Sequence, residues 1–225
     1  MSSDNEQHEP PAESPPPIDP LSRAGHLEYD RVLFLSDAIF AIAITLLVLD
    51  IRVPGFTDNP AKEIVNAKEN ILSFAISFVV IGVFWMGHHS ISRYIGAFDR
   101  RLIALNLLFL GVIAFLPFPT GLLFEHTTGP SPWAPTVFYA GCIAAAGLAE
   151  LAIWLYASSN HLLTDRTPPA LRKTLALRLL VAPIVFLLSI PIAFYSTNLA
   201  TYFWLLIVVA NWLLNRLTPR IEPAA

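Results

Sequence analysis

The sequence predicts an all-α integral membrane protein with six transmembrane helices per subunit. Of the 225 residues, 55% are hydrophobic and only 14% are charged, whereas soluble domains carry roughly 25% charged residues. The charged residues gather in short clusters, such as 99–101, between long stretches that contain none. Arginine and lysine are also distributed unequally between alternate loops. These three features are typical of membrane spans separated by loops.

The chain begins with a polar segment that we expect to be a disordered cytoplasmic tail. Residues 1–26 are acidic and rich in proline, and they include the proline run 15–17. Such a composition cannot bury enough apolar surface to form a core. We therefore place a six-helix transmembrane domain at 27–218 and a short cytoplasmic C-terminal tail at 219–225.

Six apolar segments follow the tail, each near the ~20 residues that a helix needs to cross the hydrocarbon layer. We expect helices because, in lipid, every backbone N–H and C=O group must find a partner inside the protein, and the segments are too long for barrel strands. The predicted spans are 32–51, 71–91, 102–124, 133–157, 175–195 and 201–217.

The loop charges predict the orientation of these spans. If the N-terminus is inside, the outer side receives only three basic residues, Arg52, Lys62 and Lys68. The inner side then receives the other eleven: Arg23, Arg31, Arg93, Arg100, Arg101, Arg166, Arg172, Lys173, Arg178, Arg216 and Arg220. Basic residues are enriched in cytoplasmic loops. Both termini are therefore predicted to be cytoplasmic, in a multi-pass protein of the cell (inner) membrane.

The composition also limits the classes of function. A net charge of −3 gives no indication of nucleic-acid binding, and the single Cys142 excludes a multi-cysteine metal site. His88 and His89 are adjacent, so they do not form the i, i+4 pair that binds zinc on a helix. No nucleophile motif such as G-x-S-x-G occurs in a suitable context. We expect no enzyme activity, no bound metal and no cofactor.

Polar residues inside the spans are the candidates for a special role, because they are costly in lipid. We expect Asp37 to point into the bundle toward His88 or His89 and Asn106, which are predicted to lie at a similar depth. Such a network satisfies its members and fixes helix register. A proton relay or a metal site are the alternative interpretations. The full predicted structural network is Arg31, Ser36, Asp37, His88, His89 and Asn106.

An apolar stripe runs along the other side of the first span. With 100° per residue, Ile42, Leu46 and Leu49 share one face, Thr45 flanks them, and Asp37 lies roughly 120–180° away around the helix. Taken alone, this stripe is typical of helix–helix packing.

The first span has a recognisable motif. Residues 31–51 read RVLFLSDAIFAIAITLLVLDI and resemble the signature of the prokaryotic branch of the transmembrane protein 175 family, which comprises potassium-permeable channels. The signature has an arginine, three residues, then Phe-Ser-Asp and an Ala-Ile…Thr-Leu-Leu-Val-Leu run; here Leu35 replaces its phenylalanine. FWMGHH at 84–89, NLLFL at 106–110 and LPFPT at 116–120 agree with the family. The resemblance is specific over roughly 30–125.

This resemblance implies a homotetramer in which the first helices of four subunits line one pore. It implies that Ile42, Leu46 and Leu49 form the pore constriction, a hydrophobic gate, and that Thr45 contributes a layer of hydroxyl groups. The channel would conduct K⁺ passively, with modest selectivity over Na⁺ and without a cofactor. Its partners would be K⁺, membrane lipid and other copies of the chain.

Two other functions stay open from the sequence. The first is a proton-coupled secondary transporter that uses Asp37 and His88 or His89 as an intramembrane relay. The second is a non-conducting membrane scaffold whose acidic tail recruits partners. The absence of a visible inverted repeat argues against the transporter.

Overall fold

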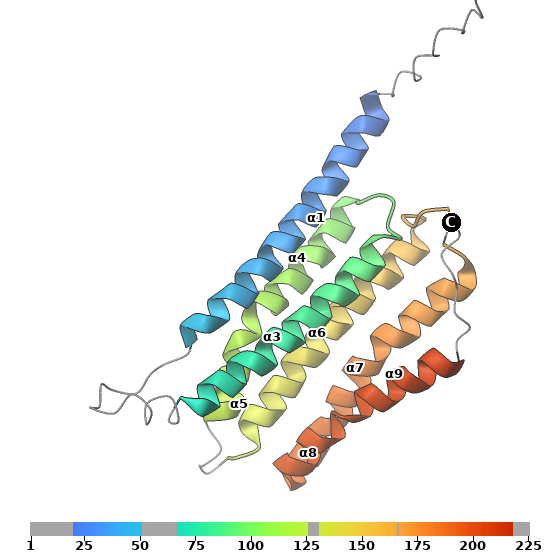
Figure 1. Ribbon diagram of the computed structural model, residues 1–225. Helices are drawn as coiled ribbons and strands as arrows, with labels where there is room; N and C mark the ends of the chain where they lie inside the picture. Colours follow the sequence, from blue (N-terminus) through green and yellow to red (C-terminus); the bar gives the residue numbers. More distant parts are fainter. Residues whose placement is uncertain (1–19, 51–66, 126–130, 166, 218–225) are drawn as a thin grey trace, which may run out of the picture.

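The computed structural model of the protein describes residues 20–50, 67–125, 131–165 and 167–217, and this part of the chain is helical (Figure 1). Its elements are α1 (Pro20–Leu46), the short 3-10 helix η1 (Leu47–Asp50), α3 (Lys68–Ser92), α4 (Arg100–Phe115), α5 (Pro117–Glu125), α6 (Ala134–Ser159), α7 (Pro169–Tyr195), α8 (Thr197–Phe203) and α9 (Leu206–Leu217). Six stretches of these residues are long and apolar enough to cross a membrane. The prediction of six spans is confirmed.

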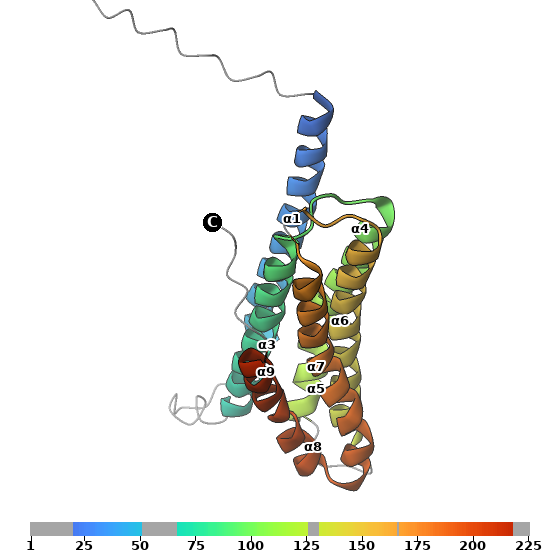
Figure 2. The ribbon, with the colours of Figure 1, turned by 90° about the vertical axis from the view of Figure 1, so that its right-hand side faces the viewer.

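The helices run back and forth between two ends of an elongated bundle (Figures 1 and 2). We call the end with residues 92–100 and the loop 160–165 the Arg100 end, and the end with η1, α5 and α8 the Leu47 end. α1 lies at one edge of the bundle, where it packs against α3 and α4. α6 lies between α4 and α7 and packs against both.

The first helix begins earlier than expected. α1 starts at Pro20, inside the range 1–26 that we predicted to be a disordered tail, whereas its membrane-spanning stretch starts at Tyr29. The boundary of the transmembrane domain at residue 27 stays a prediction. Proline is favourable at the first position of a helix. The N–H group that it lacks would have no hydrogen-bond partner within the helix at that position. The remainder of the predicted tail, residues 1–19, lies outside the described residues, as does the predicted C-terminal tail.

Close contact between α6 and α7 depends on a glycine. A Cβ atom added at Gly147 of α6 would lie 2.7 Å from Cγ and 2.9 Å from Cδ of Pro183 on α7. Gly147 and Pro183 are both buried. Small residues allow helix backbones to approach closely in membranes, where packing replaces the hydrophobic effect as the driving force for association.

Two of the six spans are interrupted. The third consists of α4 and α5, and the interruption lies at Leu116, whose N–H bonds the carbonyl of Ile113 just before Pro117. Proline cannot donate to the helix ladder and displaces the preceding turn.

The sixth span consists of α8 and α9, which are separated at Trp204 and Leu205 by i→i−3 hydrogen bonds. No proline or glycine lies there; instead, the Trp204 indole N–H donates to Oγ of buried Ser189 at 2.8 Å.

Hydrogen bonds between two loops close the Arg100 end. The Thr164 N–H donates to the carbonyl of Tyr94 at 2.8 Å, and the Gly96 N–H donates to that of Leu162 at 2.7 Å. Asp99 accepts from the Tyr156 hydroxyl at 2.6 Å and caps α4 by accepting from the Leu102 N–H at 2.7 Å. These two hydrogen bonds lower the pKa of Asp99 below its ordinary value and hold the carboxylate ionised at the start of α4.

We predict that Gly147→Ala destabilises the bundle by about 1–3 kcal/mol, because the new methyl group has to displace the rigid Pro183 ring. The thermal unfolding of the purified protein measures this effect. Gly141→Ala on the same helix is the matched control, since a Cβ there meets no atom within 4 Å. The control is expected to be neutral or slightly stabilising, and equal melting temperatures for both variants would contradict the prediction.

Candidate functional site

The first helix buries only one narrow side of its surface. The buried residues recur at helical spacing and face α3 and α4: Val32, Ser36, Phe40, Ala43 and Leu47. Most of the remaining circumference, from residue 29 onward, has no cover from the described residues of the same chain. An apolar helix surface of this kind faces either lipid or other protein subunits.

The predicted constriction residues all lie on this uncovered surface. The exposed fractions are 55% for Ile42, 52% for Leu46 and 72% for Leu49. Thr45 is exposed beside them, and its hydroxyl donates to the carbonyl of Ile42 at 3.0 Å. Its oxygen lone pairs therefore remain available to accept a hydrogen bond or contact a cation.

A shallow apolar groove borders part of this surface. It has a volume of about 320 Å³ and lies between α1 and α4. Ile42 and Leu46 line it from α1, and Leu107, Gly111 and Pro117 contribute to the other wall. Ile42 and Leu46 are thus turned toward the α4 side of the uncovered surface, whereas Leu49 does not contribute to the groove.

Only two residues of the predicted polar network are joined by a direct hydrogen bond. The Asn106 amide N–H donates to Oγ of Ser36 at 2.9 Å, and the Ser36 hydroxyl donates to the carbonyl of Val32 at 2.9 Å. Ser36 and Asn106 are both about 1% exposed. This bond favours one register of α1 against α4, because a shift would leave the buried Asn106 N–H without its acceptor.

Asp37 does not point into the bundle as we expected. It is exposed and accepts a hydrogen bond from the Trp85 indole N–H at 2.9 Å. The Trp85 ring stacks on His89 at a centroid distance of 5.5 Å. The reason is geometric: adjacent helix positions point about 100° apart, so the burial of Ser36 turns Asp37 outward. Arg31 is exposed as well.

His88 occupies an aromatic environment instead of a polar network. Its ring stacks on Phe109 at 5.1 Å and lies 6.0 Å from Phe40, measured between ring centroids. The side chain is buried, and neither ring nitrogen has a hydrogen-bond partner in the described part of the chain. The sequence analysis missed Trp85 and Phe109 as neighbours of the histidines; the i, i+4 spacing of Trp85 and His89 was the available signal.

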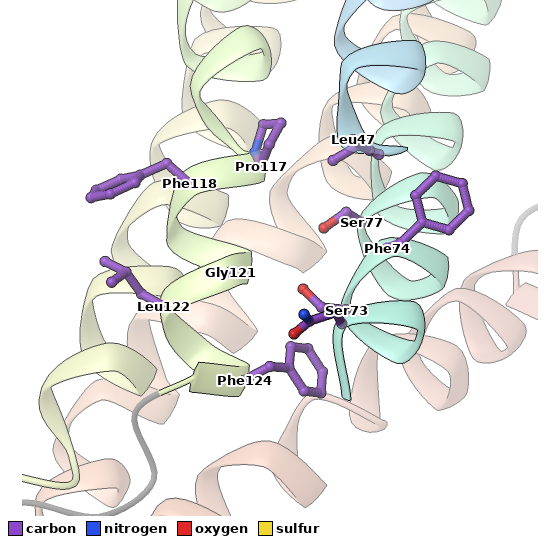
Figure 3. A pocket seen from close by; sticks show the side chains of 10 residues that line it. Leu47, Ser73, Phe74, Ser77, Pro117, Phe118, Gly121, Leu122 and Phe124 are labelled. Atoms are coloured by element: carbon purple, nitrogen blue, oxygen red, sulfur yellow. The ribbon is translucent and has the colours of Figure 1, made fainter. Parts of the chain in front are cut away.

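A second, partly polar pocket lies at the Leu47 end (Figure 3). Its volume is about 180 Å³, and it lies between α3 and α5 beside Leu47. Ser73 and Ser77 line it from α3, and Gly121 leaves space on the α5 side (Figure 3). Within the described residues, no group of three or more His, Cys, Asp or Glu side chains is placed to hold a metal ion.

The chain is similar to known channels. The family model of the endosomal/lysosomal potassium channel TMEM175 matches residues 31–117, which include most of α1 together with α3 and α4. A potassium channel of Streptomyces collinus is 34% identical over 177 residues, or 76% of this chain and 85% of that protein. A crystal structure of a lysosomal potassium-selective channel TMEM175 homolog from Chamaesiphon minutus has a TM-score of 0.70 at 28% identity, and the match covers 84% of this chain and 98% of that chain. An endosomal/lysosomal proton channel TMEM175 of Gallus gallus is 36% identical over 101 residues, 40% of this chain and 20% of that protein.

We predict that Ser36→Ala lowers the stability of the protein by on the order of 1 kcal/mol, because the buried Asn106 N–H loses its acceptor. Thermal unfolding in detergent measures the change. Ser92→Ala is the matched control: Ser92 is also buried, but its hydroxyl donates only to the carbonyl of His88 in its own helix. If both substitutions lower the stability equally, the hydrogen bond between α1 and α4 contributes no more than a bond within one helix, which would contradict the prediction.

Proposed function

The chain belongs to the endosomal/lysosomal potassium channel TMEM175 family, and on this premise we propose that it forms a passive, potassium-permeable channel with modest selectivity over Na⁺. It is a multi-pass membrane protein, and its relatives are channels and not enzymes. We place it in the cell (inner) membrane. We further propose that four copies surround one pore, and that α1 of each copy lines it.

The observation that carries this proposal is the uncovered apolar surface of α1. Ile42 and Leu46 on α1 and Leu49 on the adjoining η1 are more than half exposed. The opposite side of α1 is anchored by the Ser36–Asn106 bond. A ring of identical surfaces would bring these side chains around a common axis. The family match on residues 31–117 includes the same helix.

In this arrangement the aliphatic side chains form a hydrophobic gate. An apolar constriction controls conduction by losing or gaining water, and a permeating cation has to shed part of its hydration shell. K⁺ binds its water less tightly than Na⁺, so the constriction favours K⁺. The exposed Thr45 oxygen, whose lone pairs are free of the helix ladder, would replace part of the lost water.

The orientation that we propose places both termini in the cytoplasm. The basic residues at or near the Arg100 end are Arg93, Arg100, Arg101, Arg172 and Lys173. Tyr29 of α1 lies at the same end, where its hydroxyl donates to the Ser92 carbonyl. Basic residues favour the cytoplasmic side of a membrane. We propose that residues 27–218 form the channel domain and that residues 1–26 and 219–225 are cytoplasmic tails.

The secondary-transporter alternative finds less support in the arrangement of side chains. A relay between Asp37 and the histidines needs hydrogen-bonded groups, but Asp37 bonds Trp85, and the His88 ring nitrogens have no partner in the described residues. Proton permeation through the channel is a separate property. It should be measured as well, because the Gallus gallus relative is a proton channel.

Ion flux into liposomes that contain the purified protein tests the proposed function. We expect uncoupled K⁺ flux that exceeds Na⁺ flux and needs no proton gradient. Flux that appears only with an imposed proton gradient would favour the transporter, and absence of flux would favour a scaffold. Native mass spectrometry is expected to give four copies per assembly.

We predict that Leu46→Ala increases K⁺ conductance several-fold, because it widens the apolar ring. We predict that Ile42→Asn lowers the ratio of K⁺ to Na⁺ permeability, because the amide group brings water into the ring. Single-channel currents in planar bilayers provide both measurements. Leu155→Ala is the matched control, since Leu155 lies on α6, away from α1, and is 50% exposed, much like Leu46. Unchanged conductance and selectivity in both α1 variants would overturn the hydrophobic-ring arrangement.

A further inference from the structure

A cavity that is separate from the α1 surface lies among α3, α6, α7 and α9 (helices labelled in Figure 1). Its volume is about 420 Å³, within the ~300–1,000 Å³ range that is usual for small-molecule sites. Most of its wall is apolar, with Val83 and Phe84 from α3 and Leu179 and Phe186 from α7. Pockets of this kind, with a few convergent polar groups, are typical ligand sites.

The polar group that distinguishes this cavity is the carboxyl group of Glu150 on α6. Glu150 is 4% exposed and lines the cavity, and its Oε1 has no hydrogen-bond partner within the described residues. The carboxyl group lies against the α3 backbone, because a Cβ atom added at Gly87 would come 3.0 Å from Oε1. Gly87 thus gives Glu150 the space to reach the cavity wall.

A buried carboxyl group without a partner is costly, and the cost is larger in a membrane protein than at a water-exposed surface. In a purely structural role the group would be paired with a neighbouring donor, as the buried Ser189 oxygen is with the Trp204 indole N–H. Glu150 instead borders an apolar space large enough for a ligand. The missing partner is therefore most simply supplied by a hydrogen-bond donor from outside the chain.

We propose that this cavity binds a primary or secondary amine that carries an apolar body. The ammonium N–H groups donate to the Glu150 carboxylate beside Gly87, and the apolar body packs against Val83, Phe84 and Phe186. A charge-assisted hydrogen bond between ammonium and carboxylate is among the strong ones, and the apolar wall excludes competing water.

The other polar side chains of the cavity limit where the charged end can lie. Ser90, Arg178 and Asn211 also line it, and Arg178 has an interaction of its own. A guanidinium group repels an ammonium group placed beside it. The charged end of the ligand is thereby restricted to the side formed by α3 and α6, where Glu150 meets Gly87.

The test is direct binding of three probes with one apolar body: phenylbutylammonium, the uncharged phenylbutanol and the anionic phenylbutyrate. Radiolabelled probe is measured on the full chain in phosphatidylcholine nanodiscs, with empty discs subtracted. We expect saturable binding of the ammonium probe, at least about tenfold tighter than that of the alcohol. Equal binding of alcohol and amine, or stronger binding of phenylbutyrate, would overturn the proposal.

Two variants probe different parts of the site. Glu150→Gln keeps the shape and removes the charge, and Ala182→Phe keeps the carboxylate and fills the apolar part of the cavity, which Ala182 lines. Each is expected to weaken amine binding about tenfold or more. Asp37→Asn, which removes an exposed carboxylate elsewhere in the bundle, is the control and is expected to leave binding unchanged. Unchanged binding in a folded Glu150→Gln or Ala182→Phe protein refutes the site.

A lipid with an ethanolamine headgroup carries the same ammonium chemistry as a free amine. Repeating the measurement in discs that contain phosphatidylethanolamine separates the two sources: competition with the probe assigns the site to that headgroup, and its absence assigns the site to a free amine. The measurement needs no ion conduction. Loss of binding would therefore leave the proposed channel function untouched, and loss of flux would leave the binding site untouched.

Discussion

The packing of small side chains along α6 is the constraint on which the rest of this bundle depends. In lipid, helices gain little from burying apolar surface against one another, so close contact and hydrogen bonds have to hold them together. α6 meets α4, α5 and α7, and Gly147 lets its backbone approach the ring of Pro183. The same proline that disturbs the hydrogen-bond ladder of α7 thereby becomes part of a tight contact. α8 and α9 in turn pack against α7.

Polar groups inside the bundle have two different consequences. Where they are paired, they fix geometry: Asn106 and Ser36 hold α1 on α4, and Trp204 reaches Ser189 where the sixth span is interrupted. Where a polar atom lacks a partner in the described residues, as at His88 and Glu150, the surroundings differ. The imidazole of His88 is enclosed between aromatic rings, whereas Glu150 faces an open cavity. This difference is why the inferred ligand site rests on Glu150.

The packing of α1 leaves one of its sides free to line the proposed pore. One side of the helix is anchored to α3 and α4. The remainder, with its exposed leucine and isoleucine side chains, has no cover from the part of the chain that the structure describes. A helix that is fixed on one side and apolar on the other can line an assembly axis without a conformational change. The division also separates the two sites: the α1 surface would face the other copies in the proposed assembly, whereas the Glu150 cavity lies among helices of one chain.

The sequence by itself determined the all-helical class, the number of spans and the family, because runs of apolar residues and the motif at 31–51 are properties of the chain alone. It also predicted a similar depth for Asp37, the histidine pair and Asn106, since depth follows from the distance along a helix. The sequence did not determine the direction in which these side chains point. The outward turn of Asp37, the aromatic enclosure of His88 and the interruption at Trp204 were decided only by tertiary structure. The rotation of each helix about its axis depends on which side packs most closely against its neighbours, and that choice involves residues far apart in the chain.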